Sequence, residues 1–540
     1  MKKIDLKYLT FAFIISFVLS FMLYLYEPLL TYSSNINDFW FDFNLMISNI
    51  ILYMIIIFVF LILVYFLLYL FLRRKNIKIY KIILVISFIL FLYTYIQGNY
   101  LVGSLPQLNG DIIDWSKYGD ENIISILTFL LVVIGELALI KKFKIDKTIK
   151  INCYMTIIVF FMLFTSFISI LCNKEIYKDK SIEIATTKNI NNVSTDKNFF
   201  IFLVDSVDSR EFSDVVSSNL SYKETFNDFT YYPDTTSGYL FTRDSIPFIL
   251  SGIWNQEETD FVDYYNDAFN NSKLFKKLND ENYNMNFYEY EIYSNNRNFE
   301  KFDNIKLYSD KIDSVSFFKQ FTKYILYKYL PYPLKRYSKI ETASFDSCKI
   351  EDDIDYFKWS NKEAYNNLIN NKLEFVNDKY FQFLHIEGGH VPFDYDEDVN
   401  IIENGTYKQK LTAVLKVIST FINRLKENNA YDNSVIIILA DHGEGENTLR
   451  QNPILYIKGI NEHHEMYISD IPVAYEDLID AYISLLENKN STELFLNLDK
   501  NRPRRVLNNL YTREIMIEWY QYGKAWDNDT FKASGREFRR

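Results

Sequence analysis

The sequence is poor in cysteine and carries no excess of basic charge. Its three cysteines are Cys153, Cys172 and Cys348, and the first two belong to one apolar segment. The polar remainder therefore holds a single thiol, which excludes a disulfide framework there. The formal net charge of the 540 residues is −11. Because nucleic-acid partners require a basic face, this charge argues against a nucleic-acid-binding function.

The first third of the chain is strongly apolar. It contains five apolar stretches, at residues 9–26, 45–72, 79–96, 123–140 and 151–171. A bilayer-spanning helix needs about 20 apolar residues, so each stretch predicts a transmembrane helix. Lys2 and Lys3 precede the first stretch as in a signal peptide, but no small-residue cleavage site follows. We therefore expect this segment to be retained.

The charges between these stretches predict the orientation in the membrane. One set of connections is basic, with Lys2, Lys3, Arg73, Arg74, Lys75, Lys78, Lys141, Lys142, Lys144, Lys147 and Lys150. The other set is acidic, with Glu27, Asp38, Asp42, Asp111, Asp114, Asp120 and Glu121. Basic loops stay in the cytoplasm, so the N-terminus is expected there, and five crossings would place the chain after residue 172 outside the cell.

The remainder of the chain predicts an α/β domain with a mostly parallel sheet. Strand-like runs at 200–204, 285–290, 381–385, 435–440 and 454–457 alternate with helix-like runs at 407–428 and 474–486. The expected organisation is a transmembrane domain at 1–172, a juxtamembrane linker at 173–198, an exterior α/β domain at 199–500, and a basic tail at 501–540 packed on that domain.

One segment of the α/β region, residues 317–337, mixes aromatic residues with Lys and Arg at helical spacing. Such a composition suits a helix at the membrane interface, where rings lie at headgroup level and cations meet anionic lipid. An amphipathic helix packed on the core of the α/β domain would have the same pattern. Both interpretations stay open at the level of sequence.

Two apolar strands end in residues of metal-ligand type. Residues 200–204 lead into Asp205, and residues 434–440 lead into Asp441 and His442. Ligands of α/β sheets bind at the carboxyl ends of the strands. The five histidines of the chain all lie in the predicted exterior α/β domain, at His385, His390, His442, His463 and His464. Imidazole together with carboxylate predicts a catalytic Zn²⁺ or Mn²⁺ site rather than a structural one, which would favour thiolates.

Thr242 has two interpretations. A threonine in a turn before a helix is usually an N-cap. The alternative is a nucleophile, because a hydroxyl is inert at its ordinary pKa and a divalent cation can activate it. A helix that begins beside it would also offer backbone N–H groups to a phosphate.

Four motifs, taken in order, resemble those of a known superfamily. They are Asp205, the Thr242-Arg243-Asp244-Ser245-Ile246-Pro247 run, the segment from His385 through Gly388, Gly389 and His390 to Phe393, and Asp441-His442-Gly443-Glu444. The chain is similar to the membrane-anchored, sulfatase-like branch of the alkaline phosphatase superfamily, of the type of the lipoteichoic acid synthases and phosphoethanolamine transferases. That branch combines five N-terminal membrane helices with an exterior α/β catalytic domain.

The resemblance implies a set of roles. One divalent ion, Zn²⁺ or Mn²⁺, would be bound by Asp205, Thr242, Asp441 and His442, with Thr242 as the nucleophile. His390 would lie beside the transferred phosphate and take part in catalysis, with His385 near it as a further substrate-binding residue.

The sequence departs from the branch at two positions. Asp205 stands where these transferases usually have Glu, so the carboxylate is about one methylene shorter. A further histidine that can help to hold a second zinc is also missing, and Arg450 in that region is expected to bind phosphate, since a guanidinium matches its oxygens. His463 and His464 have no counterpart and are expected in a solvated loop.

The expected function is metal-dependent transfer of a phosphoalcohol, phosphoglycerol or phosphoethanolamine, from a phospholipid to a cell-surface glycan or glycolipid through a phosphothreonine. A sulfatase-like hydrolase acting as phosphodiesterase or sulfatase is one alternative. The sulfatase signature Cys/Ser-x-Pro-x-Arg is incomplete, however, because Ile249 stands where arginine is required. A non-enzymatic membrane protein that keeps the fold is the other alternative.

Overall fold

The apolar N-terminal third folds into long helices in the computed structural model, which describes residues 5–103, 105, 113–255, 260–293, 299–308, 310–337, 342–350, 355–444, 450–508 and 515–539. Among these residues, four helices are long and apolar enough to cross a membrane: Leu6–Ser34, Phe43–Lys75, Ile77–Tyr100 and Gly119–Leu171. They indicate a multi-pass membrane protein.

The last two of the five predicted spans meet at a kink inside one long element. Both lie in α5 (Gly119–Leu171), a 53-residue element whose one non-helical residue is Lys144, with φ 63° and ψ 157°. The connecting residues 141–150 are rich in lysine, a good helix former, and continue the helix on both sides of that break. The four long apolar helices thus contain all five predicted spans, because the kink at Lys144 divides the fourth into two helical segments.

Two compact units make up the chain. The first comprises Met1–Ser181 with Ser309–Asp352, and the second Ile182–Tyr308 with Asp353–Arg540. The chain thus passes from one unit to the other three times, whereas the sequence predicted one crossing through a linker at 173–198. The first unit contains α1 (Leu6–Phe21), a π-helix (Met22–Tyr26), α2 (Glu27–Ser34), α3 (Phe43–Lys75), α4 (Ile77–Tyr100), α5, β8 (Lys311–Ile312), α11 (Ser314–Tyr329), α12 (Tyr332–Lys335) and β9 (Lys349–Ile350).

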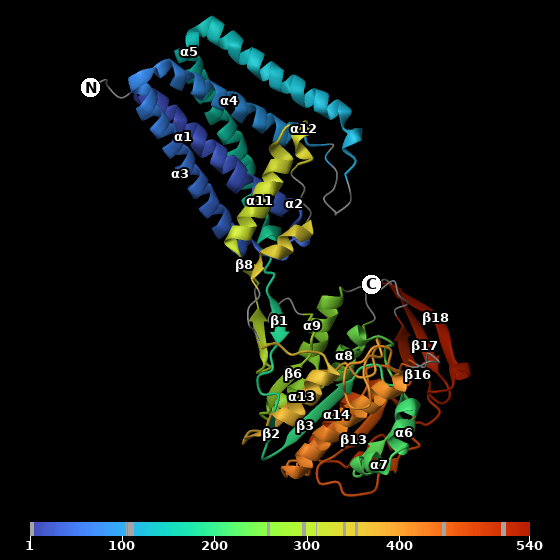
Figure 1. Ribbon diagram of the computed structural model, residues 1–540. Coiled ribbons are helices and arrows are strands. Elements are labelled where there is room, and N and C mark those ends of the chain that lie inside the picture. The colour runs from blue at the N-terminus through green and yellow to red at the C-terminus, as the bar shows by residue number, and fades with distance from the viewer. Residues whose placement is uncertain are drawn as a thin grey trace. The chain divides into compact units, whose positions relative to one another are not determined.

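Helix α11 carries the aromatic and basic segment and packs on the N-terminal helices, beside which Figure 1 shows it running. The Phe317 ring lies 5.1 Å from that of Phe41. The buried carboxylate of Glu27, at the start of α2, accepts hydrogen bonds from Lys328 Nζ at 2.6 Å and from Tyr329 Oη at 2.7 Å. The alternative in which this helix packs on the α/β core is therefore wrong.

The second unit is built on a mostly parallel sheet, as the sequence predicts. Seven strands of the described residues form it in the order β14-β4-β13-β12-β3-β11-β6. Their bounds are Tyr467–Ile468, Thr230–Tyr231, Leu455–Lys458, Ser434–Leu439, Asn198–Val204, Tyr380–Ile386 and Asn284–Tyr288. The four strands β12, β3, β11 and β6 run parallel to one another. β3 is buried over its whole length, as its uninterrupted apolar run predicts.

Helices cover both faces of this sheet. They are α6 (Ser209–Ser217), α7 (Leu220–Thr225), α8 (Thr242–Ser251), α9 (Phe261–Asn271), α10 (Lys273–Asp280), α13 (Asn361–Asn370), α14 (Tyr407–Glu427) and α15 (Leu478–Leu486). Alternate residues of β3 enter different cores: Ile201 packs in the core that includes α8, α9, α10 and α15, and Phe202 in the core that includes α6 and α14.

The C-terminal tail forms a small antiparallel sheet of the second unit. Its strands are β16 (Arg504–Asn508), β17 (Ile515–Gln521) and β18 (Phe531–Arg539). Leu507 and Met516 enter the same core as α8. The remaining strands form pairs, β1 (Ile182–Ala185) with β7 (Ile305–Tyr308), β2 (Asn192–Ser194) with β10 (Glu374–Val376), and β5 (Thr235–Thr236) with β15 (Val473–Ala474).

The ion pair of Glu27 and Lys328 gives a first prediction. Lys328→Ala leaves the Glu27 carboxylate buried without its cation, and such a change costs about 3–5 kcal/mol. We expect a lower melting temperature of the detergent-solubilised protein and faster proteolysis within residues 309–352. Lys319→Ala, at an exposed position of the same helix, is the control. If the two variants had the same melting temperature and the same rate of proteolysis, the ion pair would not be what holds α11 on the N-terminal helices.

Candidate functional site

Chemically active side chains gather at the carboxyl edge of the parallel strands. Asp205 follows β3 directly, Asp441 and His442 follow β12, His385 is the last residue but one of β11, and Glu289 follows β6. These four strands are neighbours in the order β12-β3-β11-β6. The topology therefore brings together residues that lie up to 237 positions apart in the chain.

Asp205, Asp441 and His442 form a group that is consistent with a metal site. One ligand atom from each lies within 4.8 Å of the other two. His442 Nε2 is 3.3 Å from Asp441 Oδ2 and 4.0 Å from Asp205 Oδ1. All three side chains are buried, and Asp441 Oδ2 has no hydrogen-bond partner among the described residues. A buried carboxylate oxygen without a partner fits a cation ligand.

The pKa shifts of Asp205 and Asp441 also support a cation site. Burial and the charge of Asp205 raise the pKa of Asp441. Burial also opposes ionisation of Asp205, but the neighbouring imidazoles of His385 and His442 outweigh it and lower the pKa of Asp205 to about 2. Two like charges this close in a buried site require compensation, which a divalent cation provides.

The backbone around Asp205 is shaped to hold both carboxylates. Ser206 adopts a left-handed conformation with φ 57°, and its N–H donates to Asp441 Oδ1 at 3.0 Å. Its hydroxyl donates to Asp205 Oδ1 at 2.7 Å. Gly388, with φ +60°, passes so close that a Cβ there would lie 2.3 Å from the Asp205 backbone. This position therefore requires glycine.

Thr242 lies at the site and is not an N-cap. It is the first residue of α8, the N-cap position is Phe241, and that cap makes no side-chain hydrogen bond. The Thr242 hydroxyl instead donates to Asp205 Oδ2 at 3.4 Å, and the side chain is only partly buried. The threonine thus combines a position beside the metal group with access from outside.

The two histidines of the 385–390 segment have different surroundings. The His385 ring is fully buried, with Nε2 3.6 Å from Asp205 Oδ2 and Nδ1 2.7 Å from Glu289 Oε2. Burial lowers its pKa, but the two carboxylates outweigh this and raise the pKa of His385 to about 10. His390 is partly exposed, its Nδ1 lies 2.6 Å from the Val391 carbonyl oxygen, and its ring lies 5.3 Å from that of Trp359.

A buried lysine fixes the loop that carries His390. Lys410 on α14 has no solvent exposure and donates to Glu387 Oε1, to the Pro392 carbonyl at 2.7 Å and to Asp394 Oδ1 at 3.0 Å. These three partners lie on both sides of His390 in sequence. Lys410 therefore positions the loop without belonging to the metal group.

The remaining predicted residues lie at different places. The Arg450 guanidinium pairs with Glu444 Oε2 at 2.6 Å and lies 5.2 Å from the ring of Phe241, next to Thr242. The preceding residues 445–449, where the sequence lacks the additional histidine, lie outside the described part of the chain. His463 is exposed and His464 is half-buried, and neither belongs to the metal group.

Sequence reasoning missed several residues of the site. Glu289 lay within a predicted strand, and the rule that strand ends carry ligands could have identified it. Ser206 adjoins Asp205, but its left-handed backbone has no sequence signal. Trp359 and Lys410 lie in an irregular segment and a helix, and only the tertiary contacts show their place.

The metal group gives a second prediction. Mn²⁺ or Zn²⁺ should raise the melting temperature of the wild type, with about 2.7 kcal/mol of stabilisation when the free metal is roughly 100-fold above its Kd. Asp441→Asn should abolish this gain. It should also raise the melting temperature of the metal-free protein, since it removes a buried charge next to Asp205 and keeps the Ser206 contact. Asp432→Asn, at an exposed carboxylate, is the control. An unchanged response to metal in Asp441→Asn would exclude the site.

Comparisons with known proteins agree with this arrangement. The profile of the Sulfatase family matches residues 188–475. No curated protein sequence matches the chain. Solved structures similar to it include the lipoteichoic acid synthase LtaP from Listeria monocytogenes, with 13% identity over 65% of this chain and 88% of that one and a TM-score of 0.37.

Two further structures are similarly distant. The phosphonate monoester hydrolase SpPMH from Silicibacter pomeroyi has 11% identity, covers 64% of this chain and 89% of its own, and gives a TM-score of 0.36. Ps i-CgsB in complex with k-i-k-neocarrahexaose has 14% identity, 60% and 83% coverage, and a TM-score of 0.37. The assignment rests on the profile match, which spans more than half of the chain: the protein belongs to the Sulfatase family.

Proposed function

We propose that the chain is a membrane phosphotransferase that moves phosphoglycerol or phosphoethanolamine from a phospholipid to a cell-surface glycan or glycolipid. The observation that carries the proposal is the Thr242 hydroxyl, accessible at the start of α8 and 3.4 Å from Asp205 Oδ2. The resemblance of the four motifs to the lipoteichoic acid synthase and phosphoethanolamine transferase branch agrees with it.

The residues present fit a single divalent cation. Asp205, Asp441, His442 and the Thr242 hydroxyl would hold it, and the unpartnered Asp441 Oδ2 supports this set. Oxygen donors with one imidazole suit Zn²⁺ or Mn²⁺. When bound, the cation supplies a lowered pKa for the Thr242 hydroxyl and neutralises charge on the phosphoryl oxygens.

The proposed reaction consists of two displacements at phosphorus. Thr242 Oγ1 forms a bond to the phosphorus of the lipid, the bond from phosphorus to the diacylglycerol oxygen breaks, and a proton passes to that oxygen. An acceptor hydroxyl then displaces Thr242, which recovers its proton. The amino terminus of α8 favours the negative charge of the transferred group.

His390 is the proposed residue for proton transfer and phosphate binding. Its Nδ1 is engaged with the Val391 carbonyl, which orients the ring and leaves Nε2 to exchange a proton with substrate. Lys410 holds this loop in place. The buried His385 ring cannot contact an acceptor molecule, so we assign it to orienting Asp205. We assign Arg450, which lies beside Phe241, to binding the phosphate.

A sulfatase-type nucleophile has less support. In the Cys/Ser-x-Pro-x-Arg signature the first position would be Ser245, which has no solvent exposure and whose hydroxyl donates to the Tyr239 carbonyl at 3.3 Å. Thr242, one turn earlier, is the accessible hydroxyl. A hydrolase that uses the same Thr242 and takes water as acceptor remains the second candidate within the Sulfatase family.

The membrane unit fits this proposal. The distribution of Lys and Arg, with the basic residues 141–150 around the kink of α5, supports an extracytoplasmic catalytic domain. There the donor would be a phospholipid of the same membrane and the acceptor a glycan or glycolipid of the cell surface. An enzyme anchored by four long apolar helices stays at the bilayer that holds its donor.

Intact mass of the full-length protein tests the proposal. After incubation with mixed phospholipids and Mn²⁺ or Zn²⁺, the wild type should gain the mass of one phosphoalcohol and release diacylglycerol. Thr242→Ala should do neither, because it lacks the attacking oxygen, and Thr242→Ser should keep the adduct.

Each other outcome is informative. Diacylglycerol release from the wild type without an adduct, undiminished by an added glycan, would favour the hydrolase. Neither adduct nor release would contradict the phospholipid donor. An adduct that persists in Thr242→Ala would exclude the nucleophile.

A further inference from the structure

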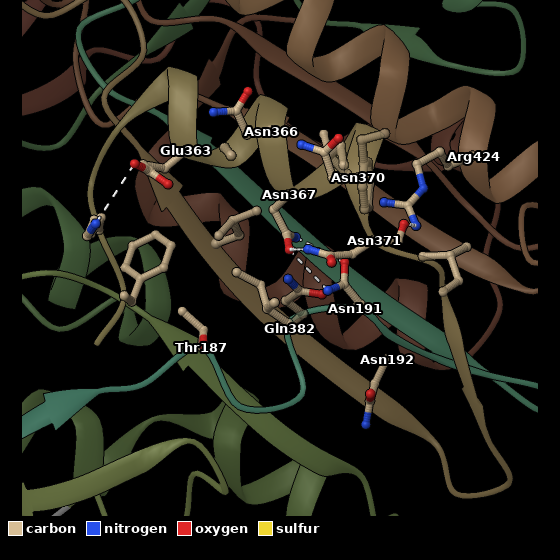
Figure 2. Close-up of a pocket in the computed structure, with 18 of the residues that line it drawn as sticks. Thr187, Asn191, Asn192, Glu363, Asn366, Asn367, Asn370, Asn371, Gln382 and Arg424 are labelled. Carbon is tan, nitrogen blue, oxygen red and sulfur yellow. Dashed lines mark hydrogen bonds and ion pairs between the residues drawn. The ribbon is translucent and has the colours of Figure 1, made fainter. Parts of the chain in front are cut away.

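A cavity in the α/β unit shares no residue with the group formed by Asp205, Asp441 and His442. Its volume is about 470 Å³, within the range of roughly 300–1,000 Å³ that is usual for ligand pockets. It is enclosed by α13, α14, the β2 region and the sheet (Figure 2). Gln382 and Leu384 of β11 line it, and because side chains alternate along a strand, it lies on the opposite sheet face from His385.

Side-chain amides dominate the polar part of the lining. They belong to Asn191, Asn192, Asn366, Asn367, Asn370, Asn371 and Gln382. Figure 2 shows three of them joined by hydrogen bonds: Asn191 and Asn367 exchange bonds of 3.1 and 3.0 Å, and Asn371 donates to Asn367 at 2.7 Å. This network holds the α13 end of the cavity in one arrangement.

The other four amides are unused. The side chains of Asn192, Asn366, Asn370 and Gln382 form no hydrogen bond with any described residue. Gln382 is the most informative, because it is only 4% exposed and still lines the cavity. Its amide atoms are not sealed from solvent, so they face the open space of the cavity, where a ligand can supply their hydrogen bonds.

Charge and shape narrow the class of ligand. Arg424 Nη2 donates to the Asn371 carbonyl at 2.6 Å, while its buried Nη1 has no partner among the described residues. Lys358 pairs with Glu363 at 3.9 Å, and Asp355 offsets Arg424, so the charged residues of the lining cancel. Phe200, Phe202 and Phe421 add apolar surface.

We propose that this cavity binds a neutral saccharide unit. A carboxamide offers a donor and an acceptor side by side, which matches hydroxyl groups that both donate and accept. The C–H faces of a sugar ring pack on the phenylalanine surface. An apolar ligand would leave the amides unpaired, and an anionic one would find no net positive charge. The proposal does not depend on the reaction at Thr242.

The test is calorimetric titration of the full-length protein, in a detergent without a sugar headgroup, with neutral oligosaccharides of hexose and of N-acetylhexosamine. At least one should bind. Gln382→Leu, which removes the buried amide, and Asn370→Ala, at an exposed position that folding does not need, should each weaken binding up to about tenfold.

Two controls make the result specific. Asn423→Ala replaces an exposed asparagine on α14 outside the lining and should bind like wild type. Thr242→Ala should also bind normally, which separates this proposal from the proposed reaction. Absence of binding by every neutral saccharide, binding of a glycerol phosphate polymer alone, or unchanged affinity in both Gln382→Leu and Asn370→Ala would overturn the proposal.

Discussion

The close approach of two buried carboxylates, Asp205 and Asp441, is the constraint on which the site depends. β3 and β12 pair in parallel with Leu203 opposite Leu439, so the strand register itself brings the two acids side by side two residues later. Their charges would repel in a buried edge of the sheet without compensation. The left-handed Ser206, the close-packed Gly388 and the imidazoles of His385 and His442 all serve to hold this pair in a form that a cation can bridge.

Much of this arrangement follows from short-range patterns. Uninterrupted apolar runs predicted β3 and β12, a largely apolar run predicted β11, and the rule of strand ends then predicted Asp205, Asp441 and His442 as neighbours. Residues that act through tertiary contacts were not predicted, since nothing near Lys410 or Trp359 in sequence shows that they surround His390. The segment 309–352 was misassigned for the same reason: its neighbours in sequence belong to the α/β unit, but its apolar face is buried against the N-terminal helices.

The residue at which α8 begins decides between the two interpretations of Thr242, N-cap or nucleophile. Had α8 begun one position later, the threonine would have been an ordinary cap and its hydroxyl would have been used by the helix itself. The helix instead begins at Thr242, and a phenylalanine that cannot cap occupies the preceding position. The hydroxyl is thereby left to Asp205, while Ser245 turns into the core three residues later.

The amide-lined cavity bears on how an acceptor would be held. A saccharide bound there cannot be the group that attacks phosphorus, because the sheet separates the cavity from Thr242. A long glycan chain offers many equivalent units, however, and holding one of them raises the effective concentration of the others near the same enzyme. A transferase must favour a glycan hydroxyl over abundant water. Binding of the acceptor glycan in the cavity would therefore raise the ratio of transfer to hydrolysis. The residues around Thr242 alone do not determine this ratio.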